Sequence, residues 1–194
     1  MKIKGYKMNN ILLVILTAFV FFGCTAKVNT DIKPYVTLHQ NEKQKVKINF
    51  LGVKDQRTTK IVSTILDDGE IYKEYPISAD ATIWYTNAFM RELKNAEMLS
   101  DEKTANIDVL VNIKNIEATY KRYSLDTKNM KANVKIELII KNNGVTNTSQ
   151  IDINQSVYKP MILDAEGFES IVNESMQNSV SKTIEILIKK TQAK

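Results

Sequence analysis

The chain has almost no cysteine or histidine: its 194 residues include one of each, Cys24 and His39. Zinc sites need clusters of these residue types, and nucleophilic catalysis needs a Ser or Cys beside a base such as His. Secreted proteins that form disulfides usually carry an even number of cysteines. The sequence therefore favours neither a zinc site nor a disulfide framework, and it offers no clear nucleophile–base pair.

Glycine is also scarce. The six glycines are scattered singly and mostly at predicted turns, so there is no Gly-rich phosphate-binding loop. Two adjacent acidic pairs, Asp67-Asp68 and Asp101-Glu102, fall in predicted turns or loops, where solvated side chains explain them. We expect a protein that is not an enzyme and that binds no metal ion.

The net charge of +5 does not indicate a nucleic-acid-binding protein, because three lysines within the first seven residues supply much of it. Nucleic-acid binding needs a clustered basic face. A hydrophobic content of 43% is enough to build a real core. We therefore expect a globular domain without a nucleic-acid partner.

The three lysines precede an apolar run over residues 11–22, which Gly23 and Cys24 follow. A basic start, an apolar segment of about 7–15 residues and a small residue at its end are typical of a secretion signal. The run is too short to cross a membrane comfortably as a helix, which takes about 20 residues. Gly23-Cys24 resembles a lipobox, although Phe21 and Phe22 stand where a Leu and a small residue are usual. The alternative is an uncleaved anchor helix with a buried free cysteine.

The lipobox resemblance implies that the Cys24 thiol is joined to diacylglycerol and that the signal is cut before this residue. The new amino terminus then receives an acyl chain such as palmitate, and several chains on one residue give stable anchoring. Thr25 stands where, in the best-known sorting pattern, an Asp retains lipoproteins in the inner membrane. We therefore expect a lipid anchor in the outer membrane, a domain facing the periplasm, and no other cofactor.

Three parts follow from this interpretation: a signal peptide over residues 1–23, the lipidated Cys24 with a flexible tether over residues 24–44, and a periplasmic domain over residues 45–194. The tether shows no sustained period, and Pro34 breaks any helix there. His39 lies in this tether, where we interpret it as a solvated side chain.

Strand-like alternation of apolar and polar residues recurs along the domain. The alternating or β-type runs cover residues 46–50, 61–66, 71–75, 107–113, 131–140 and 151–157. The first run is expected to end at Gly52. Asp68-Gly69 and Asn143-Gly144 predict two hairpins, and a slip of the period near Asn115-Ile116 predicts a bulge or bend.

Two further segments carry apolar residues at helical spacing. The first runs from a cap at Ser78 or Asp80 to about Met98, and the second from Asp164 to about Thr191. Amphipathic helices and alternating strands bury their apolar sides against each other. The predicted fold class is α+β: a two-layer sandwich with both helices on one face of a mainly antiparallel sheet of about four strands.

Two polar segments are candidates for binding a partner. Asp55-Gln56-Arg57-Thr58 follows the first strand, and its Asp and Arg could pair with each other, cap a helix or present a fork to a partner carboxylate. A structural role is the main alternative for this segment. The second candidate is the basic loop that begins with Lys121 and Arg122, between two long strands.

The lipobox, the Pro-containing tether, the strand over residues 46–50 and the sequence Asp55-Gln56-Arg57-Thr58 together resemble the YajG family of bacterial lipoproteins. The order hairpin, helix, strands and long final helix is similar over essentially all of the mature chain. The resemblance implies an outer-membrane lipoprotein facing the periplasm, with no catalytic residues. The chain departs from it by its richness in Lys and Asn and by a longer basic loop.

The resulting hypothesis is a lipid-anchored, non-enzymatic accessory module that binds a protein partner in an envelope assembly. Its candidate contact surfaces are the Asp55–Thr58 loop, an exposed sheet edge that adds a partner strand, and the loop of residues 121–128. One alternative is a carrier of lipids or other hydrophobic ligands, which requires an apolar cavity of roughly several hundred Å³. Another is an adhesin exposed on the cell surface.

Overall fold

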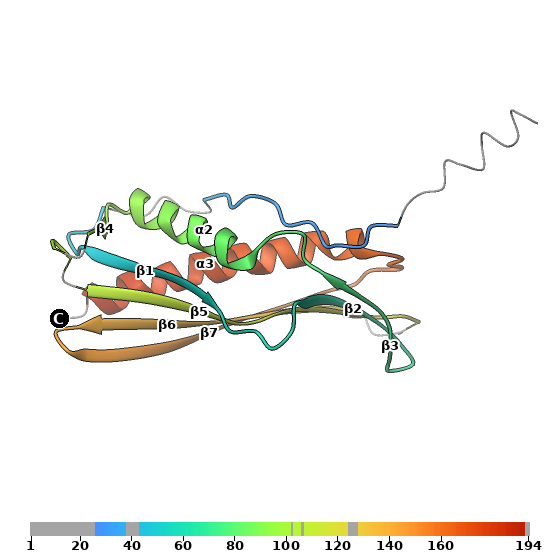
Figure 1. The fold of residues 1–194 in the computed structure, drawn as a ribbon. Coiled ribbons are helices and arrows are strands. Elements are labelled where there is room, and N and C mark those ends of the chain that lie inside the picture. Colours follow the sequence, from blue (N-terminus) through green and yellow to red (C-terminus); the bar gives the residue numbers. More distant parts are fainter. Residues whose placement is uncertain (1–25, 38–42, 102, 106, 124–127, 193–194) are drawn as a thin grey trace, which may run out of the picture.

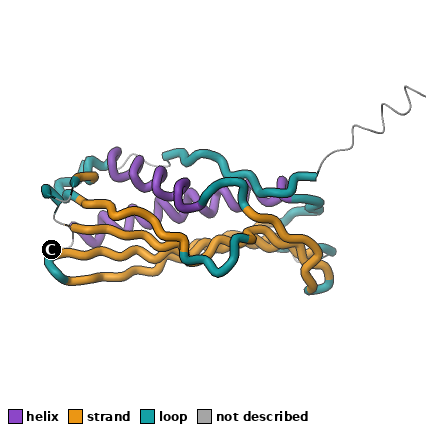
Figure 2. Tube along the Cα trace, in the orientation of Figure 1, coloured by secondary structure: helices purple, strands orange, loops and turns teal. Residues whose placement is uncertain are grey.

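The computed structural model of the chain describes residues 26–37, 43–101, 103–105, 107–123 and 128–192. The predicted signal peptide, Cys24 and His39 lie outside these residues. The described part forms a seven-stranded sheet with helices packed on it, as Figure 1 and Figure 2 show. Its elements, in chain order, are β1 (Ile48–Asp55), β2 (Ile61–Asp67), β3 (Glu70–Pro76), α2 (Ala81–Asn95), β4 (Leu99–Ser100), β5 (Ile107–Lys121), β6 (Met130–Asn142), β7 (Val145–Val157), the 3₁₀ turn η1 (Ala165–Phe168) and α3 (Glu169–Gln192).

The sheet is mixed and larger than the sequence predicted. β6 runs antiparallel to β5 along one side and is followed by antiparallel β7. Along its other side, β5 pairs in parallel with both β1 and β2. β3 is antiparallel to β2, and the short β4 is parallel to β1. The expectation of about four, mainly antiparallel, strands is therefore wrong, because alternation reveals the exposed and buried faces of a strand but not its neighbours.

β1 and β2 lie end to end along the same side of β5. β1 pairs with residues 107–113 and β2 with residues 118–121. The loop of residues 56–60 therefore leaves the sheet beside the middle of β5. β1 does not end at Gly52 as expected: this glycine takes a φ of +109° at a bulge, a conformation that glycine adopts readily, and the strand continues to Asp55.

Both helices cover one face of the sheet (Figure 1). α3 contacts β5, β6 and β7, whereas α2 contacts β1 and β4, and the two helices contact each other. The space between the layers is filled by large side chains that are almost fully buried, among them Tyr85, Phe89, Leu93, Met98, Ile113, Ile136, Leu138 and Phe168. Among the described helices, none is long and apolar enough to cross a membrane.

The helix starts agree with two predicted caps. Asp80 accepts a hydrogen bond from the backbone N–H of Ile83 at 3.0 Å, which satisfies one of the unpaired donors at the start of α2. Asp164 likewise accepts from Glu166 at 3.1 Å, but it caps the short η1 turn that leads into α3. α2 ends at Asn95, before the expected Met98.

Candidate partner-binding surfaces

The loop of residues Asp55–Thr58 is organised by an ion pair within itself. Arg57 donates from Nε to Asp55 Oδ1 at 2.9 Å and from Nη2 to Oδ2 at 2.8 Å. The backbone N–H of Arg57 also donates to Oδ1, at 3.1 Å. The two side chains are only 4% and 10% exposed, respectively. The hydrogen bonds from Arg57, assisted by one from Lys60, outweigh burial and hold the pKa of Asp55 well below its usual range.

Of the three roles predicted for Asp55 and Arg57, the structure shows mutual pairing. Nε and Nη2 of the guanidinium bind a carboxylate of its own loop, whereas Nη1 is buried without a hydrogen-bond partner. Gln56 and Thr58 are exposed beside it, and Gln56 accepts a hydrogen bond from Lys114 at 2.6 Å. A shallow hollow of about 250 Å³ separates the pair from the start of α2. The structural role is therefore the one that these contacts support for Asp55 and Arg57.

The second candidate, Lys121-Arg122, lies at the end of β5. The guanidinium carbon of Arg122 is 4.5 Å from the ring centre of Tyr72 and 4.9 Å from that of Tyr123, a cation–π arrangement with two rings. Arg122 also pairs with Asp67 at 3.0 Å. Lys121 is exposed. Residues 124–127 of the predicted loop lie outside the described residues. Arg122 thus has partners, while Tyr72 and Tyr123, which the sequence analysis did not single out, are 52% and 79% exposed.

Residues 26–37, assigned by sequence to a flexible tether, lie along the domain instead. Thr30 forms a parallel bridge with Ile77. Tyr35 is 6% exposed and packs edge-on against Trp84, whose indole N–H donates to the carbonyl of Lys33 at 2.7 Å. Burial of Tyr35 against Trp84 explains why this stretch is held although it lacks any regular period.

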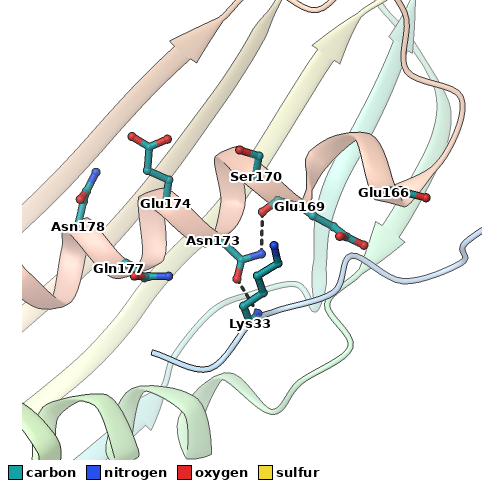
Figure 3. Close-up of a pocket in the computed structure, with 8 residues that line it drawn as sticks. All are labelled: Lys33, Glu166, Glu169, Ser170, Asn173, Glu174, Gln177 and Asn178. Atoms are coloured by element: carbon teal, nitrogen blue, oxygen red, sulfur yellow. Dashed lines mark hydrogen bonds between the residues drawn. The ribbon is translucent and has the colours of Figure 1, made fainter. Parts of the chain in front are cut away.

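The side chain of Asn173 in α3 binds backbone groups of the same stretch, and Figure 3 shows its contact with Lys33. Its Oδ1 accepts from the N–H of Lys33 at 2.6 Å, and its Nδ2 donates to the carbonyl of Asp31 at 2.8 Å. An open hollow of about 450 Å³ beside Lys33 is lined by polar side chains of α3, including Glu169 and Glu174. No sequence pattern indicated this clamp, because a buried Asn on a helix has no periodic signature.

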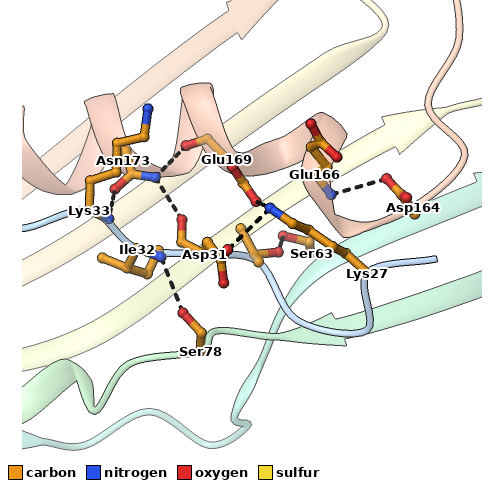
Figure 4. Close-up of polar contacts among 11 residues, drawn as sticks. Lys27, Asp31, Ile32, Lys33, Ser63, Ser78, Asp164, Glu166, Glu169 and Asn173 are labelled. Carbon is orange, nitrogen blue, oxygen red and sulfur yellow. Dashed lines mark hydrogen bonds and ion pairs between the residues drawn. The ribbon is translucent and has the colours of Figure 1, made fainter. Parts of the chain in front are cut away.

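Lys27 holds the beginning of the described N-terminal stretch (Figure 4). Its Nζ lies 2.7 Å from Glu169 and 3.1 Å from Asp31, and these hydrogen bonds raise its pKa above the usual range. The carbonyl of Lys27 accepts from the N–H of Ala165 at 3.5 Å. The chain therefore joins the domain beside η1, at the start of α3.

β7 is an exposed edge of the sheet. It pairs with β6 along all 13 of its residues and with no other strand in the described part of the chain. It contains no Lys or Pro, and its single charged residue is Asp152. Lysine, proline and short length are the usual protections of edge strands. β3 has these features: it is seven residues long, carries Lys73 and ends with Pro76.

The face of the sheet opposite the helices is polar and hydrogen-bonded. Glu137 accepts from Gln150 at 3.0 Å and pairs with Lys114 at 3.2 Å, and hydrogen bonds led by that from Asn112 lower its pKa. Near the end of β5 and the start of β6, Lys121 and Lys131 line an open hollow of about 620 Å³. No group of three or more His, Cys, Asp or Glu residues suited to a metal ion occurs in the described ranges.

Comparison with known proteins shows a likeness of fold only. No protein-family model matches the chain, and no curated protein matches it. A crystal structure of an uncharacterized protein superimposes with a TM-score of 0.50 at 11% identity, covering 80% of this chain and 96% of that one. A Xanthomonas campestris protein of the family DUF330 gives a TM-score of 0.49 at 9% identity, covering 84% and 91%.

Rare lipoprotein B from Shewanella oneidensis also matches, with a TM-score of 0.42 at 14% identity, covering 66% of this chain and 95% of that one. None of these three structures is described as a YajG protein, so that resemblance stays a prediction. Identities this low show nothing about function.

Proposed function

We propose that this protein is a lipid-anchored lipoprotein of the outer membrane, facing the periplasm, that acts as a non-enzymatic accessory module and binds a protein of an envelope assembly. The anchor is supported by the sequence around Cys24. The binding role is supported by one observation above all, the long unprotected edge of β7. The other exposed edges are short, and that of β3 is charged as well.

The backbone geometry of β7 suits it to adding a partner strand. Asn142 and Val145 are opposite each other across a two-residue turn, and such a pair exchanges both of its backbone hydrogen bonds. Alternate residues from Thr146 onward therefore turn their N–H and C=O groups away from β6. Strand addition uses these groups for affinity. A strand from the partner that runs beside β7 would satisfy them.

The carrier alternative has less support. It requires an apolar cavity between helices and sheet, whereas that space is filled by buried side chains such as Tyr85 and Phe89. The hollows of about 450, 520 and 620 Å³ are open at the surface and lined mostly by polar residues. In the adhesin alternative the domain faces the outside of the cell instead of the periplasm. Protease added to intact cells would then cleave the protein.

The test is purification of the tagged full-length protein from its own membranes in mild detergent, with mass spectrometry of co-purified proteins and lipids. Thr148→Pro removes an outward N–H of β7 and spares the N–H groups that bond to β6, while Thr148→Val is the matched control. We expect a stoichiometric envelope protein with the wild type and Thr148→Val, and its loss with Thr148→Pro. Cys24→Ala should lose the attached lipid.

Equal recovery of the partner with Thr148→Pro, with the variant correctly folded by circular dichroism, would reject the β7 edge as the contact. A defined co-purifying lipid without any protein would support the carrier instead. An unmodified Cys24 in the mass spectrum of the wild type would reject the lipid anchor.

A further inference from the structure

Besides Val157 (39% exposed), six large apolar side chains are exposed at one end of the domain, the end where β5 and β7 finish and β6 begins. They come from β3, from the turn just after β5 and from the segment that links β7 to η1. They are Ile71 (63% exposed), Tyr72 (52%), Tyr123 (79%), Tyr158 (55%), Met161 (67%) and Leu163 (64%). We call this set the apolar end. By contrast, the turn between β6 and β7 at the other end of the sheet exposes Val145 (59%).

The segment that links β7 to η1 is held by hydrogen bonds to its backbone. Asn129 donates to the carbonyl of Lys159 at 2.7 Å and accepts from its N–H at 2.9 Å. The hydroxyl of Tyr120 donates to the carbonyl of Pro160 at 3.3 Å, and that of Tyr75 donates to the carbonyl of Leu163 at 3.4 Å. Backbone groups of the β7–η1 segment thus form hydrogen bonds with side chains of the domain. The side chains of Tyr158, Met161 and Leu163 are exposed to solvent.

The chain reaches the domain at this same end. In Figure 1 the described N-terminal stretch begins beside the start of α3, at the end of the molecule that also carries the tip of the β2–β3 hairpin. The hydrogen bond from Ala165 to the carbonyl of Lys27 fixes that position. Ala26 is two residues from Cys24. An extended chain of two residues spans at most about 7 Å.

We propose that the apolar end rests on the surface of the lipid bilayer that holds the anchor, so that the domain stands on the membrane with the β6–β7 turn farthest from it. This inference depends on the proposed lipidation of Cys24. A lipid on Cys24 leaves about 7 Å of chain between the anchor and the domain, which brings this end to the membrane surface. The three tyrosines suit that place, since their rings combine an apolar body with a polar tip and are enriched at membrane interfaces.

Charge is not the reason for this contact. The basic residues at the apolar end are Lys73, Lys121, Arg122, Lys128 and Lys159. The acidic residues at this end are Asp67 in β2, Asp68 in the turn, Glu70 in β3 and Asp164 before η1. With both signs present, attraction to anionic lipids is largely cancelled. The contact is therefore expected to change little with salt concentration, in contrast to binding through a basic patch.

The experiment uses the full-length lipidated protein in vesicles of phosphatidylethanolamine and phosphatidylglycerol. Two single variants, Tyr123→Cys and Met161→Cys, each carry an environment-sensitive fluorophore at the apolar end. Val145→Cys carries it at the other end, about 40 Å away along β7 at about 3.3 Å per residue. Cys24 does not react when its thiol is joined to lipid. Phospholipids with a spin label near the headgroup act as quenchers.

We expect quenching at residues 123 and 161 to exceed that at residue 145 at least threefold, with little change between low and high salt. A combined Tyr72→Ser, Met161→Ser and Leu163→Ser variant should reduce quenching at residue 123, with the same unfolding temperature as the Tyr123→Cys parent. Equal, weak quenching at all three positions would overturn the inference. Quenching at residues 123 and 161 that weakens as the protein-to-lipid ratio rises would also overturn the inference. The apolar end would then be covered by a second copy of the chain.

Mass spectrometry of the same samples separates the two proposals. Lipid on Cys24 with equal quenching at both ends leaves the anchor in place and rejects only the membrane contact. An unmodified Cys24 rejects the anchor, and with it the basis for the contact.

Discussion

The hydroxyl groups of Tyr85 in α2 and Ser179 in α3 form a hydrogen bond of 2.9 Å between the helices, inside the core. Ser179 also donates to the carbonyl of Met176 at 2.7 Å. Its single proton is thereby used, so Tyr85 is the donor of the bond between the helices. Burial raises the pKa of Tyr85, which keeps the hydroxyl protonated as this role requires.

Tyr85→Phe should lower the free energy of unfolding by about 1 kcal/mol, because it removes one buried hydrogen bond without creating a large cavity. Urea unfolding followed by circular dichroism measures this. Tyr158→Phe is the matched control: this tyrosine is 55% exposed, and we expect no measurable change. Equal stability of Tyr85→Phe and wild type would show that this bond contributes nothing net.

Removal of one partner from the Asp55–Arg57 pair should be more costly. Both Asp55→Asn and Arg57→Ala should lose roughly 2–4 kcal/mol of unfolding free energy, since each leaves a mostly buried group without its charged partner. Lys60→Ala, whose side chain is 71% exposed, should lose under about 1 kcal/mol. If Arg57→Ala proved as stable as wild type but lost a co-purifying protein, the loop would be an interface after all.

The same pair predicts a pH dependence. The folded-state pKa of Asp55 lies below that of the unfolded chain, about 3.9, so the native state favours the ionised form. Its contribution to stability is complete above that value and is lost as pH falls further. The stability difference between wild type and Asp55→Asn should therefore be constant from about pH 5 to 8 and shrink below about pH 4. Urea titrations from pH 8 down to below about pH 4 measure this difference. A difference that stays constant below about pH 4 would contradict the assignment.

Asn173→Ala should release residues 31–36 from α3. It removes the hydrogen bonds to Lys33 and Asp31, and buried backbone groups left without partners cost about 1–3 kcal/mol each. We expect faster proteolysis and faster amide hydrogen exchange in this stretch, with the sheet unaffected. Ser170→Ala, at an exposed position of the same helix, should behave like wild type. Unchanged exchange at Lys33 in Asn173→Ala would show that the clamp has no role.

The sequence predicted the elements better than their arrangement. Both helices, the caps Asp80 and Asp164 and the two hairpin turns were predictable, because they depend on spacing and on turn residues close together in the chain. The slip near Asn115 is confirmed as a register shift between β5 and β6. The parallel pairing of β1 and β2 with β5 was not predictable, since it joins residues far apart whose local pattern is the same for either neighbour.

The candidate binding surfaces likewise combine features that depend on residues close together in the chain with features that only the fold reveals. The tetrapeptide at Asp55 is recognisable in the sequence because opposite charges stand two residues apart. Asn173 has no sequence signal, because its partners are backbone groups of a stretch without any period. Tyr72 and Met161 have none either, since isolated exposed apolar residues are ordinary and only the fold shows that they gather at one end. Cys24 lies outside the described residues, so its lipidation stays a prediction.

The length of β5 has a consequence for how a partner would be held. Its 15 residues extend over roughly 50 Å at about 3.3 Å per residue. β6 pairs with β5 and β7 pairs with β6, so β7 extends over most of the same length. On a domain that stands on its apolar end, β7 descends from Val145 toward the lipid at Val157. A strand added to β7 would then lie along the membrane normal. The register of that strand on β7 would then set the height of the partner above the bilayer. A shift of the register by two residues would change this height by about 7 Å.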